Sequence, residues 1–350
     1  MGRNRHPVGR ATAAAGGGHL DRIAGPARRL AAIRRGSGHF TLDFVSFKEL
    51  KPLPLAFLAV LALPLHAAEL PPLNSPATNE TYPGKFVWAD LFTADRAAAE
   101  KFYTGVFNWT ATEVERATPS GTHSYVILSN DGRPIAGIAV RPKKLKDEAR
   151  GRWVGYISVA DVPATLAAAT AQGGKIIFPS KDLPQRGTQA IFADPEGALV
   201  GVIHSSSGDP GEYIPGAGDW VWAEHFARDP AAAQRFDHAV LAYETSPDDR
   251  IKTPNTFLLS SGGYARGSIA PLPAKAGAHP AWLLFVRVTD IQAAIAQVTA
   301  LGGEIRVKPR QIEPTTWLAV VRDPVGSAIG LIQLDEQAGA PAAASPGGQP

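Results

Sequence analysis

Two carboxylates occupy matching places in this sequence, each two residues after a tryptophan. Asp90 follows Trp88 in the segment FVWADLF, and Glu224 follows Trp222 in the segment WVWAEHF. Side chains two residues apart on a strand lie on the same face, so each carboxylate shares a face with an indole. A carboxylate buried in such surroundings can act as a general acid or base. The alternative interpretation of Asp90 is a strand carboxylate that faces the surface or the linker.

His225 is a third residue with catalytic potential, because imidazole exchanges protons near neutral pH. It directly follows Glu224 in the sequence. Adjacent strand residues point to opposite faces, so the two side chains cannot both face one cavity. We therefore expect one of them to be exposed to solvent. No catalytic motif is recognisable, and Asp90, Glu224 and His225 are the candidates that the sequence offers for catalysis.

Aromatic residues provide candidates for ligand binding. Most of the tryptophans Trp88, Trp153, Trp222, Trp282 and Trp317 lie at the start of predicted strands. Large amphipathic rings suit cavity walls that stack on planar ligands, although packing between modules explains them equally well. Tyr125, on a further predicted strand, can add a polar contact. The predicted ligand-binding residues are Trp88, Asp90, Tyr125, Trp222 and Glu224.

The elements that position these residues repeat along the chain. The strand, Asp and Ala-rich helix that begin at Phe86 recur from Trp220, and those that begin at Trp153 recur from Trp282. Because each half also contains the strand–Asp–helix pattern twice, the sequence predicts four βαβββ modules. An Asp precedes each helix as its predicted N-cap: Asp95, Asp161, Asp229 and Asp290. We expect strands near 86–92, 123–129, 134–140, 153–159, 188–193, 199–204, 220–226, 255–260, 282–288, 316–321 and 327–333.

The repeated segments also resemble a known family. VWADLFTADRAAAEKFYTGVFNW, YISVADVPATLAAATAQGGKI and DPEGALVGVI are similar to the vicinal oxygen chelate superfamily, which includes glyoxalases, bleomycin resistance proteins and dioxygenases. The resemblance implies an α+β fold in which four βαβββ modules form two half-open barrels, each with a cavity for a small molecule. The second half has Phe236-Asp237-His238 where the family has Phe-Tyr, so we expect its first module to be degenerate.

The resemblance also identifies where a metal would be held. Family members that use a metal bind it with His, Gln or Glu near the start of a module's first strand and with Glu near the end of its last strand. The corresponding residues here are Trp88, Val154, Trp222, Leu283, Gly201 and Gly330. Their side chains cannot ligate a metal ion. We therefore expect no metal and no cofactor, which argues against glyoxalase and extradiol dioxygenase chemistry.

Residues 48–68, which follow a basic prefix of unusual length, are typical of an export signal. Lys48 and Lys51 precede the apolar run LPLAFLAVLALPL, and His66-Ala67-Ala68 follows it. A basic flank, a short apolar run and small residues predict cleavage after Ala67 or Ala68 and an exported, periplasmic or extracellular protein. The predicted organisation is a leader (1–68), a linker (69–84), a first domain (85–205), a linker (206–217), a second domain (218–334) and a disordered tail (335–350).

The charge balance and the hydropathy of the sequence limit the kinds of partner that the protein can have. Residues 1–68 hold 10 of the 35 Lys and Arg residues but only 3 of the 32 Asp and Glu residues, so the remainder of the chain is slightly acidic. This balance argues against a nucleic-acid partner. No apolar run is long enough to span a bilayer, so we expect no stable membrane insertion once the signal is removed. The sequence leaves the oligomeric state open.

These observations lead to one favoured function and two alternatives. The favoured function is an exported, metal-independent protein that binds a small molecule, with planar aromatic compounds as the class that its tryptophans suit. The first alternative is a lyase, isomerase or oxygenase of the same superfamily that acts on a small organic substrate. The second is a structural or interaction module whose cavities are filled by side chains. A cavity beside Trp88 or Trp222 would argue against the last of these.

Overall fold

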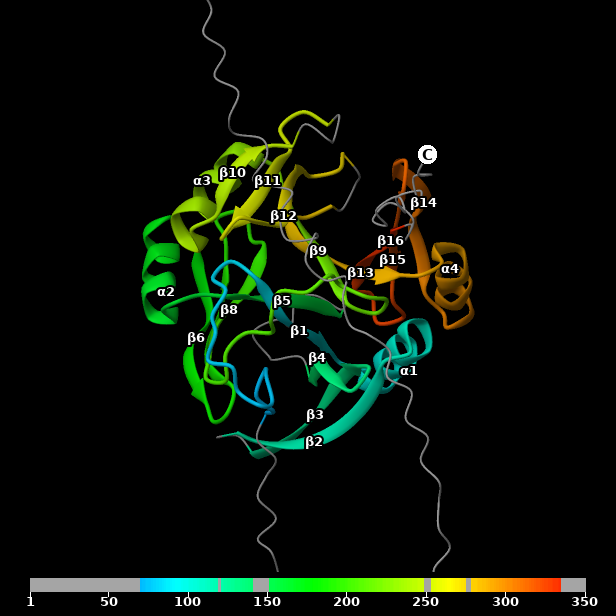
Figure 1. Ribbon diagram of the computed structural model, residues 1–350, viewed down its shortest axis with the longest axis horizontal. Helices are drawn as coiled ribbons and strands as arrows, with labels where there is room; N and C mark the ends of the chain where they lie inside the picture. Colours follow the sequence, from blue (N-terminus) through cyan, green and yellow to red (C-terminus); the bar gives the residue numbers. More distant parts are fainter. Residues whose placement is uncertain (1–69, 119–120, 141–150, 249–252, 275–277, 335–350) are drawn as a thin grey trace, which may run out of the picture. The chain divides into compact units, whose positions relative to one another are not determined.

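The computed structural model describes residues 70–118, 121–140, 151–248, 253–274 and 278–334 (Figure 1). All of them belong to one structural unit, which begins at Leu65. The predicted leader (1–68) and the predicted tail (335–350) lie outside the described residues. None of the described helices is both long enough and apolar enough to cross a membrane.

The described chain consists of four modules, each made of a strand, a helix and three further strands. The first two modules are β1 (Phe86–Thr93), α1 (Arg96–Phe107), β2 (Thr110–Thr118), β3 (Gly121–Asn130) and β4 (Arg133–Val140), followed by β5 (Arg152–Ser158), α2 (Val162–Ala171), β6 (Lys175–Leu183), β7 (Gly187–Ala193) and β8 (Leu199–Ser205). The other two are β9 (Trp220–Ala227), α3 (Pro230–Leu241), β10 (Glu244–Pro247), β11 (Phe257–Ser261) and β12 (Tyr264–Pro271), followed by β13 (Ala281–Val288), α4 (Ile291–Ala300), β14 (Glu304–Glu313), β15 (Thr316–Arg322) and β16 (Ala328–Leu334).

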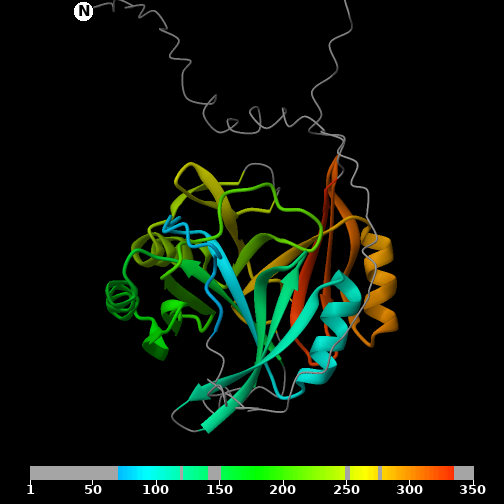
Figure 2. The ribbon, with the colours of Figure 1, turned by 60° about the horizontal axis from the view of Figure 1, so that its bottom comes forward.

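Each pair of modules shares one curved sheet of eight strands. The first sheet has the order β2-β3-β4-β1-β5-β8-β7-β6, and the second has the matching order β10-β11-β12-β9-β13-β16-β15-β14. The first strands of paired modules are antiparallel neighbours at the centre, β1 beside β5 and β9 beside β13. Figures 1 and 2 show these central strands with the other strands of their modules on either side. The predicted α+β fold, with four βαβββ modules forming two half-open barrels, is confirmed, and each half-open barrel is an eight-stranded curved sheet that does not close.

The four helices begin where the sequence predicts. Each is preceded by its Asp, whose side chain accepts a hydrogen bond from a backbone N–H of the first turn. In α1, for example, the Asp95 carboxylate accepts from Ala98 N at 3.0 Å. Such a bond satisfies one of the N–H groups that have no partner within the helix. The predicted N-cap role is therefore confirmed for Asp95, Asp161, Asp229 and Asp290.

The strand positions expected from the apolar pattern are present, but five further strands have no counterpart among them. The additional strands are β2, β6, β10, β12 and β14. Four of these five are the edges of the two sheets. Edge strands commonly carry charged residues and proline, which break the apolar alternation that reveals a strand. The fifth, β12, contains Gly267 and ends at Pro271.

The two sheets pack through their outer faces. The outer face of the first sheet is defined here by Ala89 and Leu91 on β1, and that of the second by Ala223 and His225 on β9. A single apolar core joins both outer faces to all four helices. Across it, α1 contacts α4 and α2 contacts α3, so helices of one domain pack on helices of the other. The opposite, inner faces carry the Trp–carboxylate pairs and have separate apolar clusters.

Candidate functional site

The inner face of the first sheet brings together three of the predicted ligand-binding residues. Asp90 Oδ1 accepts hydrogen bonds from Trp88 Nε1 at 2.8 Å and from the Tyr125 hydroxyl at 2.6 Å. Asp90 Oδ2 accepts a third from the Tyr156 hydroxyl at 3.1 Å. Asp90 is only 7% exposed, so the interpretation of this residue as a surface carboxylate is wrong, whereas the linker-facing alternative agrees with the packing of Leu70 and Leu73 on the same face. Its hydrogen bonds hold three aromatic side chains in place.

Other side chains cover this face. The Arg186 guanidinium lies 4.0 Å from the centre of a Trp88 ring, and Arg186 is almost fully buried. Leu70 and Leu73, from the segment before β1, pack into the same cluster, together with Leu183. An arginine and several leucines thus pack on the face that carries the buried Asp90 carboxylate. This face fits the alternative of a cavity filled by side chains.

The inner face of the second sheet is less covered. Trp222 and Glu224 are partly buried rather than buried, and the cluster around them has a buried core of Leu283, Phe285 and Ile332. Trp222 Nε1 donates to the Ser268 hydroxyl at 3.0 Å, and Ser268 also hydrogen-bonds to Glu224. Burial raises the pKa of Glu224 to about 7, although the positive charge of Arg310 opposes this shift. A carboxyl that titrates near neutral pH can take up or release a proton during a reaction.

His225 lies on the outer face, inside the contact between the two domains. Its ring stacks on Trp282, its Nδ1 is 2.9 Å from Asp237 Oδ2, and its Nε2 is 3.0 Å from Asp194 Oδ2. The His225 side chain is 0% exposed. Burial alone would lower the pKa of His225, but the Asp237 and Asp194 carboxylates outweigh it and raise the pKa to about 9. The imidazolium form therefore joins the domains electrostatically.

One expectation about this region needs correction. The expectation that either Glu224 or His225 is exposed is wrong, because the opposite side of β9 is covered by the first domain rather than by solvent. The third module, which we expected to be degenerate, has all five elements, but its β10 and β11 have 4 and 5 residues against 9 and 10 in β2 and β3. The unusual Asp237 has a structural reason, since it pairs with His225. The sequence did contain a signal for this ion pair, because two positions change together between the repeats. His225 replaces Leu91, and Asp237 replaces Tyr103.

Two of the positions that the resemblance implies for metal ligands, Gly201 and Gly330, are covered by aromatic rings. Tyr156 covers Gly201 so closely that a Cβ on that glycine would lie 2.5 Å from the ring, and Phe285 covers Gly330 in the same way. A Glu cannot occupy either position without displacing the aromatic ring. Across the described part of the chain, no group of three or more His, Cys, Asp or Glu side chains is placed to hold an ion. Tyr156 and Phe285 thus take up the space beside these two glycines.

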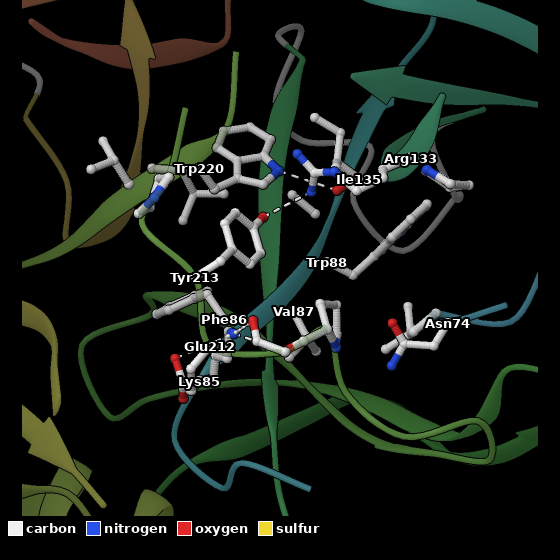
Figure 3. Close-up of a pocket in the computed structure, with 18 of the residues that line it drawn as sticks. Asn74, Lys85, Phe86, Val87, Trp88, Arg133, Ile135, Glu212, Tyr213 and Trp220 are labelled. Carbon is white, nitrogen blue, oxygen red and sulfur yellow. Dashed lines mark hydrogen bonds and ion pairs between the residues drawn. The ribbon is translucent and has the colours of Figure 1, made fainter. Parts of the chain in front are cut away.

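A cavity of about 840 Å³ lies where the two domains meet (Figure 3). Its walls come from the starts of β1, β4, β9 and β12, from the segment 71–75 and from the interdomain segment 210–215. Two predicted ligand-binding residues, Trp88 and Trp222, line it, whereas Asp90, Tyr125 and Glu224 do not. Its volume is within the range of about 300–1,000 Å³ that is usual for small-molecule sites.

Sequence reasoning did not identify the polar residues of this cavity. Lys85, Arg133, Glu212 and Arg266 line it, and Tyr213 and Trp220 form part of its aromatic wall. Figure 3 shows Tyr213 and Trp220 near each other, with Lys85 and Glu212 side by side at one end. Most of these residues lie in loops or at strand ends, where no periodic pattern reveals which way a side chain points. The main sequence clue to this cavity was Trp222, the second tryptophan of the WVW segment. It matches Trp88 in the first half of the repeat.

Family comparisons agree with this fold. Residues 85–202 match the family model of the glyoxalase/bleomycin resistance protein/dioxygenase superfamily, and residues 221–332 match the model of a glyoxalase-like domain. The chain belongs to this superfamily, which is the vicinal oxygen chelate superfamily, and carries two of its domains in tandem.

Similar proteins include enzymes and biosynthesis proteins. The chain is 28% identical over 260 residues to the "Putative glyoxylase CFP32" of Mycobacterium bovis, covering 74% of this chain and 98% of that protein. It is 29% identical over 273 residues to the "Anthracycline biosynthesis protein DnrV" of Streptomyces peucetius, covering 75% and 97%. Among solved structures, the Mn(II)-bound glyoxalase from Novosphingobium aromaticivorans has a TM-score of 0.49 at 15% identity, covering 73% of this chain and 85% of that one. The 2,3-dioxygenase LapB from Pseudomonas sp. KL28 has the same TM-score and identity, covering 72% and 93%.

Proposed function

We propose that this chain is an exported protein that binds a small organic molecule in the cavity between its two domains without a metal ion. The observation that carries the proposal is the cavity of about 840 Å³ beside Trp88 and Trp222. Aromatic walls with a few polar groups are typical of sites that bind organic ligands. The name of the relative from anthracycline biosynthesis also supports a small organic ligand.

Metal independence is supported by the residues on the two inner faces. Trp88 and Gly201 take ligand positions in the first domain, and Trp222 and Gly330 take them in the second. Indole and glycine supply no metal-binding atom, and the nearby rings of Tyr156 and Phe285 take up the space. Binding in the cavity therefore uses shape, apolar contact and charge.

Isothermal titration calorimetry of the full chain with two matched probes, 2-naphthoate and 2-naphthamide, tests the binding proposal. At least one probe should bind, with the same affinity before and after treatment with a chelator. Replacing Ala265, which lines the cavity, by Trp should abolish binding because the indole fills the site. Ala239→Trp, at an exposed position on α3, is the control that leaves binding unchanged. Failure of both probes to bind, or equal binding by both variants, contradicts the proposal.

Export is the second part of the proposal and rests on the segment from Lys48 to Ala68. N-terminal sequencing of protein from the native compartment tests it directly. A mature start near Glu69 supports export. Residues 1–68 retained on the protein in the cytoplasm contradict it.

A second candidate function is acid–base catalysis on the inner face of the second sheet. The observation that favours it is the partly buried Glu224, whose burial raises its pKa to about 7, beside Trp222 and Ser268. In this reading the chain is a lyase or isomerase that moves a proton with Glu224. Glu224→Gln separates the two functions, because it abolishes proton transfer while leaving the interdomain cavity intact. Binding of the naphthyl probes should survive this substitution.

A further inference from the structure

The charged residues of the interdomain cavity are unequal in number. Three cations line it, Lys85, Arg133 and Arg266, against one carboxylate, Glu212. Two further carboxylates, Asp219 and Asp209, lie nearby but do not line the cavity. Asp219 is paired with Arg133 at 2.7 Å, and Asp209 accepts hydrogen bonds from Tyr82 N and from the Ser158 hydroxyl. A molecule inside the cavity can therefore contact the three cations, whereas Asp219 and Asp209 are not part of the lining.

Lys85, Arg266 and Glu212 form one cluster. Arg266 Nη2 is 2.7 Å from Glu212 Oε1, and Lys85 Nζ is 3.4 Å from Glu212 Oε2. The exposed fraction of the side chain is only 7% for Arg266, 14% for Lys85 and 21% for Glu212. Burial lowers the pKa of Lys85, and the neighbouring Arg266 lowers it further against the opposing effect of Glu212. Two buried cations thus share one carboxylate, and an additional anion would relieve their repulsion.

The two cations differ in how much hydrogen-bonding capacity remains. Lys85 Nζ donates to the backbone oxygens of Pro210 at 2.7 Å and Gly211 at 2.6 Å, and also faces Glu212, so its three donors hold the interdomain segment. Arg266 Nε, by contrast, is buried and has no hydrogen-bond partner among the described residues. Glu212 Oε1 also lacks a hydrogen-bond partner among them, because its contact with Arg266 Nη2 is an ion pair without hydrogen-bond geometry. A buried donor without a partner is costly, and a bound acceptor would satisfy it.

The rest of the wall is aromatic. Six rings line the cavity: Phe86, Trp88, Tyr213, Trp220, Trp222 and Tyr264. The indole N–H groups of Trp88, Trp220 and Trp222 already donate to Asp90, Ile135 and Ser268. Trp220 and Trp222, which are only partly buried, therefore offer apolar surface to a ligand, which suits a planar aromatic body. Trp88 is 4% exposed, and Arg186 lies over its ring.

We propose that the interdomain cavity selects aromatic anions, and that Arg266 recognises their negative charge. This inference rests on the proposed binding function of the same cavity. The aromatic body lies against the rings, and its carboxylate accepts from Arg266 Nε beside the Lys85–Glu212 pair. Glu212 competes with the ligand for Arg266, so it limits the affinity while keeping the two cations together in the free protein.

The two naphthyl probes distinguish this inference from simple binding, because 2-naphthoate and 2-naphthamide share one aromatic body and differ in charge. Calorimetry on the full chain should show roughly tenfold or more tighter binding of naphthoate, as expected for a hydrogen bond to a charged group. Arg266→Met should remove this preference, and Arg266→Lys should keep part of it. The exposed Arg235→Met on α3 is the control and should change neither affinity.

Glu212→Gln provides a second measurement with the opposite sign. Removing the competing carboxylate should tighten naphthoate binding several-fold and leave naphthamide binding unchanged. A purely structural role of Glu212 predicts weaker binding of both probes and would overturn the inference. Equal affinities of the wild-type chain for both probes would also overturn it while leaving the proposed binding function standing. Binding of neither probe would contradict both.

Discussion

The two inner faces are built from the same sequence repeat, but the carboxylates at their matching positions differ in burial and in hydrogen bonding. On the first, Asp90 accepts three hydrogen bonds and is buried, Arg186 lies over the neighbouring Trp88 ring, and Leu73 packs in the apolar cluster of this face. On the second, Glu224 occupies the same place in the repeat but stays partly exposed, with a pKa raised to about 7 by burial. The same fold therefore holds one carboxylate as an internal support and leaves the other open to exchange a proton.

The strand register shows which side chains cause the difference. Tyr156 on β5 is paired in register with Trp88 on β1, whereas Phe285 on β13 is paired with Trp222 on β9. Likewise, the register places Thr256 where Tyr125 stands, and the Thr256 hydroxyl donates to Thr253 O instead. The second face thus lacks both tyrosine hydroxyls that bind the carboxylate on the first. Loss of two donors, rather than a change in fold, keeps Glu224 available.

The contacts between the domains differ in a parallel way. In one, the Tyr103 hydroxyl donates to Asp323 Oδ2 at 2.7 Å and accepts from Trp153 Nε1. In the other, His225 lies between Asp194 and Asp237, with Trp282 stacked on its ring. The first contact places one carboxylate beside a neutral hydroxyl, and the second places a cation between two carboxylates. The two contacts should therefore respond differently to substitution and to pH.

Replacing His225 by Leu should have the largest effect on stability. It leaves Asp194 and Asp237 buried without their cation, which costs about 3–5 kcal/mol in the free energy of unfolding. The matched change in the other contact, Tyr103→Phe, leaves only hydrogen bonds unmade and should cost about 1–3 kcal/mol. Urea unfolding followed by circular dichroism measures both. Equal losses would show that the charge on His225 contributes nothing beyond a hydrogen bond, and His279→Asn, at an exposed position, is the control.

The covered state of the first inner face depends on the segment before β1. Leu73 is buried in that segment, so Leu73→Ala should cost about 2–3 kcal/mol. Leu318→Ala, on the partly buried cluster of the second face, should cost about 1 kcal/mol because less surface is buried there. Urea unfolding of both variants compares the two faces. A larger loss for Leu318→Ala would reverse the assignment of the covered and the open face.

The pH dependence of stability should reveal the charged contact. The folded pKa of His225, raised to about 9, lies above its ordinary value of 6.5, so protonated His225 stabilises the fold fully below pH 6.5. This stabilisation is lost as pH rises from 6.5 through 9, on the order of 2–3 kcal/mol. The comparison of the wild-type chain with His225→Gln at pH 6, 7.5 and 9 isolates it. If the difference in unfolding free energy between the two chains does not shrink with pH, His225 is not charged in the folded state.

Much of the fold could be predicted from sequence because its signals are local. The alternation around Trp88 and Trp222 predicts central strands, and an Asp before each helix predicts the helix starts. Edge strands such as β6 and β14 could not be predicted, because charged residues and proline break their alternation. These strands are defined by pairing with a neighbour rather than by a buried face.

The candidate site was less predictable because it depends on contacts between distant segments. Trp88 and Trp222 follow from the repeat, but Arg266 and Glu212 meet only after the two domains pack. His225 shows the same limit. Its neighbour Glu224 could be placed on the opposite face from the sequence, yet the partner Asp194 comes from a turn of the other domain. Pattern reasoning assigns a residue to a face, and tertiary packing decides what covers that face.

The smallest expected effect concerns Glu224 and sharpens the comparison between the two inner faces. The folded pKa of Glu224 is raised by burial to about 7, above the ordinary value of 4.5. The protonated form is therefore favoured in the folded chain, and this stability is present below pH 4.5 and lost as pH rises through 7. Glu224→Gln keeps a neutral side chain at all pH values, so above pH 7 it should be more stable than the wild type by about 1 kcal/mol, since partial exposure reduces the penalty. Asp90→Asn should instead be destabilising, because the Asp90 carboxylate accepts from three donors and an amide nitrogen cannot accept. Urea unfolding at pH 5 and pH 8 separates the two outcomes, and stabilisation by Asp90→Asn would show that both carboxylates are in equivalent surroundings.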